Sequence, residues 1–175
     1  CSSDLGSVDN KKYAITDIFK VAALTSKEIE FIIIGGQNDN QIQELKLQAK
    51  KFNVENKTKI IGWTSRTRIT EILKESKIGL MALRNTFSNR HSIPLKMLDY
   101  ISHGLPVIAP DYHAFHEIIT NEEHGFYLDW ETQHQEIANK IEEIVLDDFQ
   151  FLQLSENVYK KAKDLTWTRR AGEQI

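Results

Sequence analysis

Short runs of apolar residues alternate along this chain with stretches in which apolar residues recur at helical spacing. The apolar runs are strand-sized, and this alternation is typical of a parallel α/β sheet with right-handed helical crossovers. No repeat, low-complexity tract or Pro/Gly-rich linker interrupts it, so it predicts one domain. The expected strands are 30–36, 59–62, 78–83, 104–109 and 124–128; the expected helices are 13–24, 41–52, 66–75, a segment after Pro94, and helices from about 131 to 163.

Composition agrees with a domain of this kind and excludes some classes of function. At 175 residues, with 41% hydrophobic and 27% charged residues, the chain can bury a core. A net charge of −3 gives no reason to expect nucleic acid or an anionic membrane as the main partner. The longest apolar run is strand-sized, which leaves a peripheral membrane association open. One cysteine excludes an internal disulfide and a cysteine-based zinc site, and the six histidines show no metal-ligand grouping, so no metal is expected.

The first five residues, CSSDL, match the translation of TGC TCT TCC GAT CT and one further base, a string that resembles a sequencing-library adapter. We therefore expect residues 1–5 to be an artefact, with a polar tail as the alternative. The protein sequence would then begin at Gly6, just before or inside the first strand. Residues 6–175 would form the domain.

The run from 92 to 111, SIPLKMLDYISHGLPVIAPD, carries the most specific chemistry. Pro94 suits the first helical position, and the N–H groups of Leu95 and Lys96 then follow at the positive end of the helix dipole, where an anion fits. The cation of Lys96 opposes that dipole, which favours a nearby phosphate. Asp99, about one and a half turns later, is a carboxylate suited to ribose hydroxyls. We expect Leu98, Ile101 and Leu105 to be buried.

Loops that follow the carboxyl ends of parallel strands are where ligands bind, and two of them carry glycine. Gly35 and Gly36 would let a ligand approach the backbone, although they form neither a G-x-G-x-x-G fingerprint nor a P-loop. Gly62 precedes Trp63, which would either stack on a base or, as the more frequent outcome, lie half buried against its own domain.

The polar loop 84–93, RNTFSNRHSI, lies between an expected strand and the helix that starts near Pro94. Such loops commonly carry function. Arg90 or His91 would contact the sugar or pyrophosphate of a ligand there. The alternative is a mobile, solvated loop.

The 92–111 run resembles the donor-binding segment of the retaining glycosyltransferases of family 4, or group 1. Their typical form has two glutamates eight positions apart, then a helix and G-x-P-V-I-A. Asp99 stands at the second glutamate, which in that family binds the ribose hydroxyls. His91 stands at the first, which lies near the donor sugar and the reaction centre. Ser92, Pro94 and Lys96 resemble the S-x-P-x-K version of some members.

The resemblance continues upstream. Gly6 and Lys12 fall where the family has the glycine and the phosphate-contacting lysine of a G-R-L-x-x-x-K-G run, although Ser7 and Tyr13 replace its arginine and second glycine. A solvated helix start is the alternative for Lys12. The family also has glycines beside the nucleotide at the place of Gly35 and Gly36, and an F-x-G segment facing the base near Gly62.

The resemblance implies the C-terminal half of a GT-B fold, a Rossmann-like parallel sheet flanked by helices that binds the donor. The implied reaction transfers a sugar from a nucleotide-diphosphate sugar to a glycan or other acceptor with retention, without an obligatory metal or cofactor. The acceptor would bind an N-terminal domain that this chain lacks, so the fragment should bind the donor without turnover. The implied location is the cytoplasm or the inner face of the membrane.

Two other functions fit the same residues. A nucleotide-sugar 2-epimerase has the same two-domain fold but needs a carboxylate pair and a histidine around the sugar, for which His91 is the only hint. A non-catalytic nucleotide-sugar-binding module would account for the missing first glutamate. An epimerase needs no acceptor, and a binding module never releases nucleoside diphosphate.

Overall fold

The computed structural model describes residues 2–5, 13–36 and 38–165, of which residues 2–5 are described by their backbone alone. These residues form a six-stranded sheet with the order β3-β2-β1-β4-β5-β6, and every pair of neighbouring strands is parallel. This is the doubly wound order, in which the direction of winding reverses between β1 and β4. The strands are β1 (Ser2–Leu5), β2 (Phe31–Ile34), β3 (Thr58–Ile61), β4 (Ile78–Leu80), β5 (Val107–Ala109) and β6 (Gly125–Tyr127). The predicted parallel α/β sheet is confirmed.

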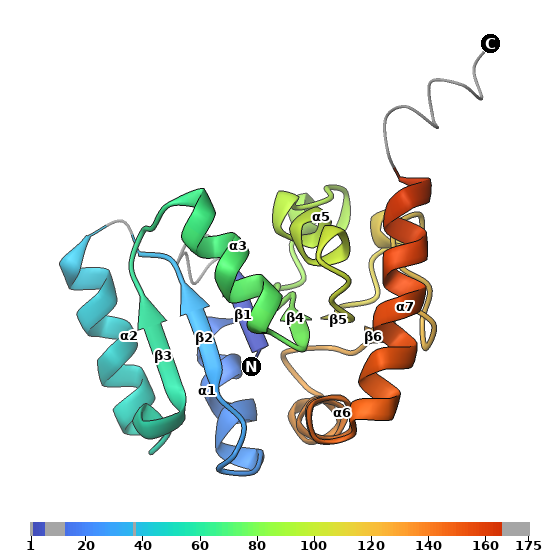
Figure 1. The fold of residues 1–175 in the computed structure, drawn as a ribbon. Helices are drawn as coiled ribbons and strands as arrows, with labels where there is room; N and C mark the ends of the chain where they lie inside the picture. The colour runs from blue at the N-terminus through green and yellow to red at the C-terminus, as the bar shows by residue number, and fades with distance from the viewer. Residues whose placement is uncertain (1, 6–12, 37, 166–175) are drawn as a thin grey trace.

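Helices cover both faces of this sheet (Figure 1), with α1 behind β2 and α3 in front of β1. Helix α1 packs on α6, and α5 packs on α7. The α-helices are α1 (Ile15–Leu24), α2 (Asp39–Lys51), α3 (Arg66–Glu75), α4 (Phe87–Arg90), α5 (Leu95–Ser102), α6 (His134–Leu146) and α7 (Asp148–Asp164); Glu55–Lys57 and His113–Phe115 form short 3-10 helices.

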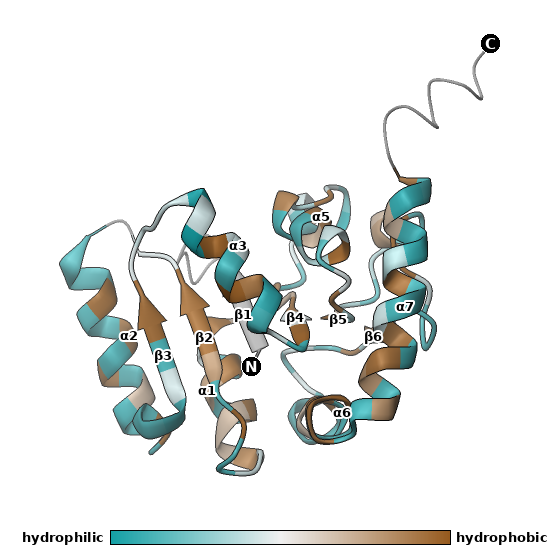
Figure 2. Ribbon diagram, in the orientation of Figure 1, coloured by the Kyte–Doolittle hydropathy of each residue, from teal (hydrophilic) through white to brown (hydrophobic). Residues whose placement is uncertain are grey.

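The core lies between the sheet and the helices, where Figure 2 shows brown apolar segments on the strands and on the inner sides of the helices. All four residues of β2 are buried, because a central strand of a parallel sheet is covered on both faces. That double burial explains why the strands appear as continuous apolar runs rather than as alternating patterns. The largest fully buried side chains are those of Trp130, Tyr100, Phe19, Phe31 and Phe115.

Polar side chains cap the starts of α2 and α3. Asn38 accepts a hydrogen bond from the Gln41 N–H at the start of α2, and Ser65 accepts one from the Arg68 N–H at the start of α3. The predicted 66–75 helix has the bounds of α3, whereas the predicted 78–83 strand ends as β4 at Leu80. The expected loop 84–93 contains the short helix α4, which Thr86 caps through the Asn89 N–H.

Strand β1 occupies a central place in the sheet, between β2 and β4. The backbone of Ser2–Leu5 pairs in register with Phe31–Ile34, and Ser2 and Ser3 also pair with Ile78 and Gly79. Such pairing uses main-chain groups, which every residue except proline supplies. The adapter origin of residues 1–5 therefore stays a prediction. Among the described residues, none of the helices has the length and apolar character needed to cross a membrane.

Candidate functional site

The point where the sheet reverses its winding lies between β1 and β4, and the segments that follow these two strands meet there. Tyr13 and Leu83 form an isolated antiparallel bridge, and the Ala14 N–H donates to the Ala82 carbonyl at 3.0 Å. A crevice beyond the carboxyl ends of the strands at this point is the usual ligand position in doubly wound sheets. The segment after β4 leads through the short helix α4 to α5, whose N-terminus is the predicted anion site.

Helix α5 packs against β4 through a close contact between Tyr100 and Gly79. The Tyr100 ring packs against Gly79 so tightly that a Cβ at Gly79 would lie 2.4 Å from the ring carbons Cγ and Cδ2. Tyr100 is fully buried, and its hydroxyl lies 3.4 Å from the Leu80 carbonyl oxygen. Glycine at position 79 thereby sets how close α5 lies to the sheet.

The N-terminus of α5 departs by one residue from the predicted position. Pro94 has extended backbone angles (φ −67°, ψ 137°) and is the N-cap, so Leu95 is the first helical residue. The expected burial of Ile101 and Leu105 is confirmed, but the prediction for Leu98 is wrong, since it is 39% exposed. The buried face of the helix instead carries Lys96, Met97, Tyr100 and Ile101.

Lys96 is buried, with 7% of its surface exposed. Its Nζ lies 4.8 Å from the centroid of the Tyr13 ring, within cation–π distance. Tyr13 belongs to the segment after β1, so Lys96 brings its charge to the junction of the β1 and β4 segments. A phosphate contact by Lys96 stays a prediction.

Asp99 lies on the side of α5 that faces α3 and is 18% exposed at its side chain. Both of its carboxylate oxygens accept hydrogen bonds from Arg66, the first residue of α3: Arg66 Nη1 donates to Oδ2 at 2.9 Å, and Nη2 donates to Oδ1. The pairing raises the pKa of Arg66, first through the hydrogen bond and then through the charge of Asp99. Ribose binding by Asp99 stays a prediction, and no sequence pattern indicated that Arg66 would contact it.

The glycines after β2 and β3 permit close packing of α2. Gly36 has a positive φ of 99°, and a Cβ there would lie 3.1 Å from Ile42 Cγ1. A Cβ at Gly62 would lie 2.8 Å from Ile42 Cδ1. The Gly35 N–H donates to the Ile61 carbonyl at 2.9 Å, which joins the ends of β2 and β3. The packing against Ile42 explains Gly36 and Gly62 without a ligand, and the place of Gly35, Gly36 and Gly62 beside a nucleotide stays a prediction.

Trp63 is 89% exposed. The expectation that it lies half buried against its own domain is therefore wrong. The loop after β3 turns its indole outward before Ser65 starts α3. An exposed tryptophan offers a large flat surface to a partner, so base stacking stays a prediction.

The predicted residues before α5 bond mainly within their own turn. Ser92 Oγ donates to the Ser88 carbonyl at 2.8 Å, and His91 Nδ1 lies 2.8 Å from the Phe87 carbonyl oxygen. Arg90 is exposed. The pKa of Tyr112 is raised to about 12, mainly by burial and also by the charges of Asp129 and Glu131. Arg90 opposes this rise in pKa, so it faces the segment after β5 that holds Tyr112.

A buried carboxylate that sequence reasoning missed holds the start of the loop after β4. Asp17, in the first turn of α1, is 4% exposed and accepts from Lys20 Nζ at 2.7 Å and from His134 Nε2 at 2.9 Å. Arg84 lies 3.9 Å from Asp17 and donates to Glu131 at 2.6 Å. The network connects α1, α6 and Arg84, and so fixes the direction in which the chain leaves β4.

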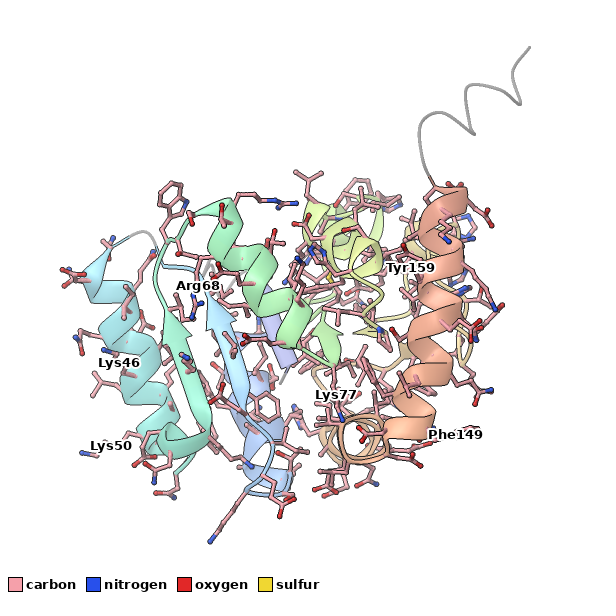
Figure 3. All side chains as sticks on the ribbon, in the orientation of Figure 1. Lys46, Lys50, Arg68, Lys77, Phe149 and Tyr159 are labelled. Carbon is pink, nitrogen blue, oxygen red and sulfur yellow. The ribbon has the colours of Figure 1, made fainter. Side chains whose placement is uncertain are left out.

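Gly6 and Lys12 lie outside the described residues. Within those residues, no three His, Cys, Asp or Glu side chains are grouped as a metal ion would require. A hollow of about 320 Å³ lies between α2 and the amino end of β3, on the side where Figure 3 labels Lys46 and Lys50. It is at the opposite ends of the strands from the α5 N-terminus, and it is lined by Lys46, Ala49, Lys50, Glu55, Thr58 and Ile60.

Two curated proteins match the sequence. A chitobiosyldiphosphodolichol beta-mannosyltransferase from Arthroderma benhamiae is 29% identical over 138 residues, which cover 76% of this chain and 29% of that protein. The protein of the same name from Candida albicans is 26% identical over 88 residues, covering 50% of this chain and 19% of its own length. This chain thus spans less than a third of the length of either relative.

Solved structures share the fold. Anabaena HepE in complex with UDP has a TM-score of 0.81 at 16% identity, over 99% of this chain and 46% of that chain. The C-terminal domain of the group 1 glycosyl transferase LpcC from Francisella tularensis has a TM-score of 0.75 at 19% identity, over 94% and 84% of the two chains. The fold is the Rossmann-like half of a GT-B protein. The sequence profile of the glycosyl transferases group 1 matches residues 5–165, and this chain belongs to that family.

Proposed function

We propose that this chain is the donor-binding domain of a glycosyltransferase that transfers a sugar from a nucleotide-diphosphate sugar to a glycan or other acceptor, with retention of configuration. The observation that carries the proposal is the position of α5. Its N-terminus follows the segment that leaves β4 at the reversal of the sheet, and Asp99 lies on its first turns. Nucleotides bind at this place in doubly wound sheets.

The comparisons support a nucleoside diphosphate as the ligand. Anabaena HepE is described in complex with UDP and with UDP-glucose. The two curated relatives are named as mannosyltransferases. We therefore take UDP as the first probe. The proposal does not specify which hexose the donor carries.

In the proposed mechanism, the backbone N–H groups of Leu95 and Lys96 and the ammonium of Lys96 receive the pyrophosphate. They stabilise the charge that develops on the leaving diphosphate, so no metal ion is required. Asp99 accepts hydrogen bonds from the ribose hydroxyls. His91 stands on the sugar side, and the acceptor approaches from a second domain that completes the cleft.

The experiment is to join the chain to a complete N-terminal domain from longer coding sequence and to follow UDP release with and without acceptor. The proposal predicts acceptor-dependent release and a product whose anomeric configuration, read by NMR, equals that of the donor. Release of an epimerised sugar without acceptor would replace the transferase with a 2-epimerase. Tight donor binding without any release would indicate a binding module, and an inverted product would contradict retention.

We also propose that the complete protein works in the cytoplasm or peripherally at the inner face of the membrane. Cytoplasmic nucleotide sugars would reach the donor site there directly. Fractionation of cells that express the complete protein should recover it from the cytosol or, after a salt wash, from membranes. Recovery only after detergent extraction would contradict the peripheral location.

A further inference from the structure

The carboxylate of Asp99 is already occupied in this structure. Arg66 binds it side by side, with Nη1 on Oδ2 at 2.9 Å and Nη2 on Oδ1. This bidentate geometry uses the outward-facing lone pairs of both carboxylate oxygens. Asp99 and Arg66 are 33 positions apart, so the contact is a product of the fold and bridges α3 and α5.

A ribose needs the same lone pairs. Its 2′ and 3′ hydroxyls are neighbours on one ring, and a carboxylate binds both by accepting one hydrogen bond on each oxygen. The guanidinium presents its two donors to the same two oxygens with a similar spacing. A nucleotide therefore cannot place both hydroxyls on Asp99 in this way while Arg66 keeps both of its bonds.

We propose that Arg66 determines how much the ribose contributes to nucleotide affinity, because a nucleoside diphosphate must displace it from Asp99 in order to bind. This inference rests on the proposed function of the site. In the ligand-free protein Arg66 shields Asp99. On binding, the ribose hydroxyls replace the two guanidinium N–H groups.

Exposure of the two partners makes this exchange feasible. The Arg66 side chain is 68% exposed, whereas that of Asp99 is 18% exposed and held on a packed helix. Arg66 can therefore swing into water while Asp99 stays in place. An exposed ion pair contributes little, so its loss lowers nucleotide affinity by no more than about fivefold.

The position of Arg66 in α3 favours its pairing with Asp99 when no ligand is present. Arg66 is the first residue of α3, where the helix dipole is positive and a cation is unfavourable. Arg68 is a cation in the same first turn and is equally unfavourable there. It pairs within its own helix, since its Nη1 donates to Glu71 at 2.8 Å. Figure 3 shows Arg68 on the side of α3 toward β2 and β3, away from α5. Arg68 is thus a control matched in charge and helix turn.

The test compares the wild-type chain, Arg66→Ala and Arg68→Ala by calorimetry with UDP and with 2′,3′-dideoxy-UDP. Both substitutions remove one positive charge from the first turn of α3, so they weaken the general attraction of the diphosphate to a similar extent, and dideoxy-UDP measures any difference between them. We expect Arg66→Ala to bind UDP about two- to fivefold more tightly than Arg68→Ala does. Dideoxy-UDP should bind the two variants equally, because it has no hydroxyls to compete for Asp99. Thermal unfolding checks that each variant is folded.

Two other results have distinct meanings. If UDP binds and Asp99→Asn abolishes the preference for UDP over dideoxy-UDP, but Arg66→Ala binds UDP no better than Arg68→Ala, the displacement of Arg66 is refuted while the proposed site stands. A selective loss of UDP affinity in Arg66→Ala would likewise refute it and make Arg66 a direct ligand. If the folded wild-type chain binds no nucleoside diphosphate, the proposed function itself fails.

Discussion

Replacing Gly79 with alanine should push α5 away from the sheet. The new Cβ would lie 2.4 Å from two carbons of the fully buried Tyr100 ring. Carbon atoms prefer about 3.5–4.0 Å, so the ring or the strand has to move by roughly 1 Å or more. Overpacking of this kind costs about 1–3 kcal/mol, and the reduced freedom of the unfolded chain offsets about 0.4–1 kcal/mol of it. We expect a net loss of about 1–2 kcal/mol in the free energy of unfolding.

Urea and thermal unfolding measure this effect, and a loss of that size lowers Tm by about 2–8 °C in a domain of this length. In a Tyr100→Ala background the ring is gone, so Gly79→Ala should cost about 1 kcal/mol less or even stabilise by filling space. UDP binding should weaken as well, because α5 carries the predicted phosphate and ribose contacts. Unchanged stability in the wild-type background, or an equal cost with and without the ring, would refute the packing argument.

Three further predictions follow from single side chains. Asp99→Asn should lose about 1.5–3 kcal/mol of UDP affinity, ten- to a hundredfold, with a smaller loss for dideoxy-UDP; equal losses in calorimetry would make Asp99 a structural residue. Lys96→Met, which keeps the buried stem, should weaken UDP but leave uridine nearly unchanged, and an equal loss for both ligands would contradict a phosphate contact. Burial lowers the pKa of His124 below its ordinary 6.5, Glu123 opposes this and Lys161 adds to it, while His124 Nδ1 accepts from the Thr120 N–H at 3.0 Å. The unfolded chain therefore takes up the proton first, so stability should fall as the pH drops below about 6.5, and His124→Asn should flatten that slope in urea unfolding at a series of pH values.

The sheet could be predicted because its strands β2, β4 and β5 are buried on both faces. A run such as FIII fits a buried parallel strand and is too short for a helix, and the cap at Ser65 marks the start of α3. Strand β1 carried no such signal, since Ser2–Leu5 is mostly polar. The Thr86 cap was a readable sign of α4 within the loop 84–93.

The site was harder to predict than the fold, because its contacts join distant positions. The Arg66–Asp99 pair and the Asp17–His134 pair depend on how helices meet, which periodicity does not encode. The exposure of Trp63 depends on whether another element packs against the loop after β3, which the local sequence does not indicate. The burial of Leu98 was predicted one position off, since Met97 lies on the buried face and Leu98 does not, whereas Ile101 is buried as predicted.

The central claim is that a nucleoside diphosphate binds beyond the carboxyl ends of β1 and β4, at the N-terminus of α5. Titration of the isotopically labelled chain with UDP, followed by amide chemical shifts in NMR, tests it most directly. The account predicts that the largest shifts fall on 95–99, with further shifts at Gly35, Gly36, Gly62 and Trp63, and that UMP produces them more weakly than UDP. Shifts centred instead on the hollow beside Lys46, Lys50 and Thr58, or equal binding of UMP and UDP, would contradict it.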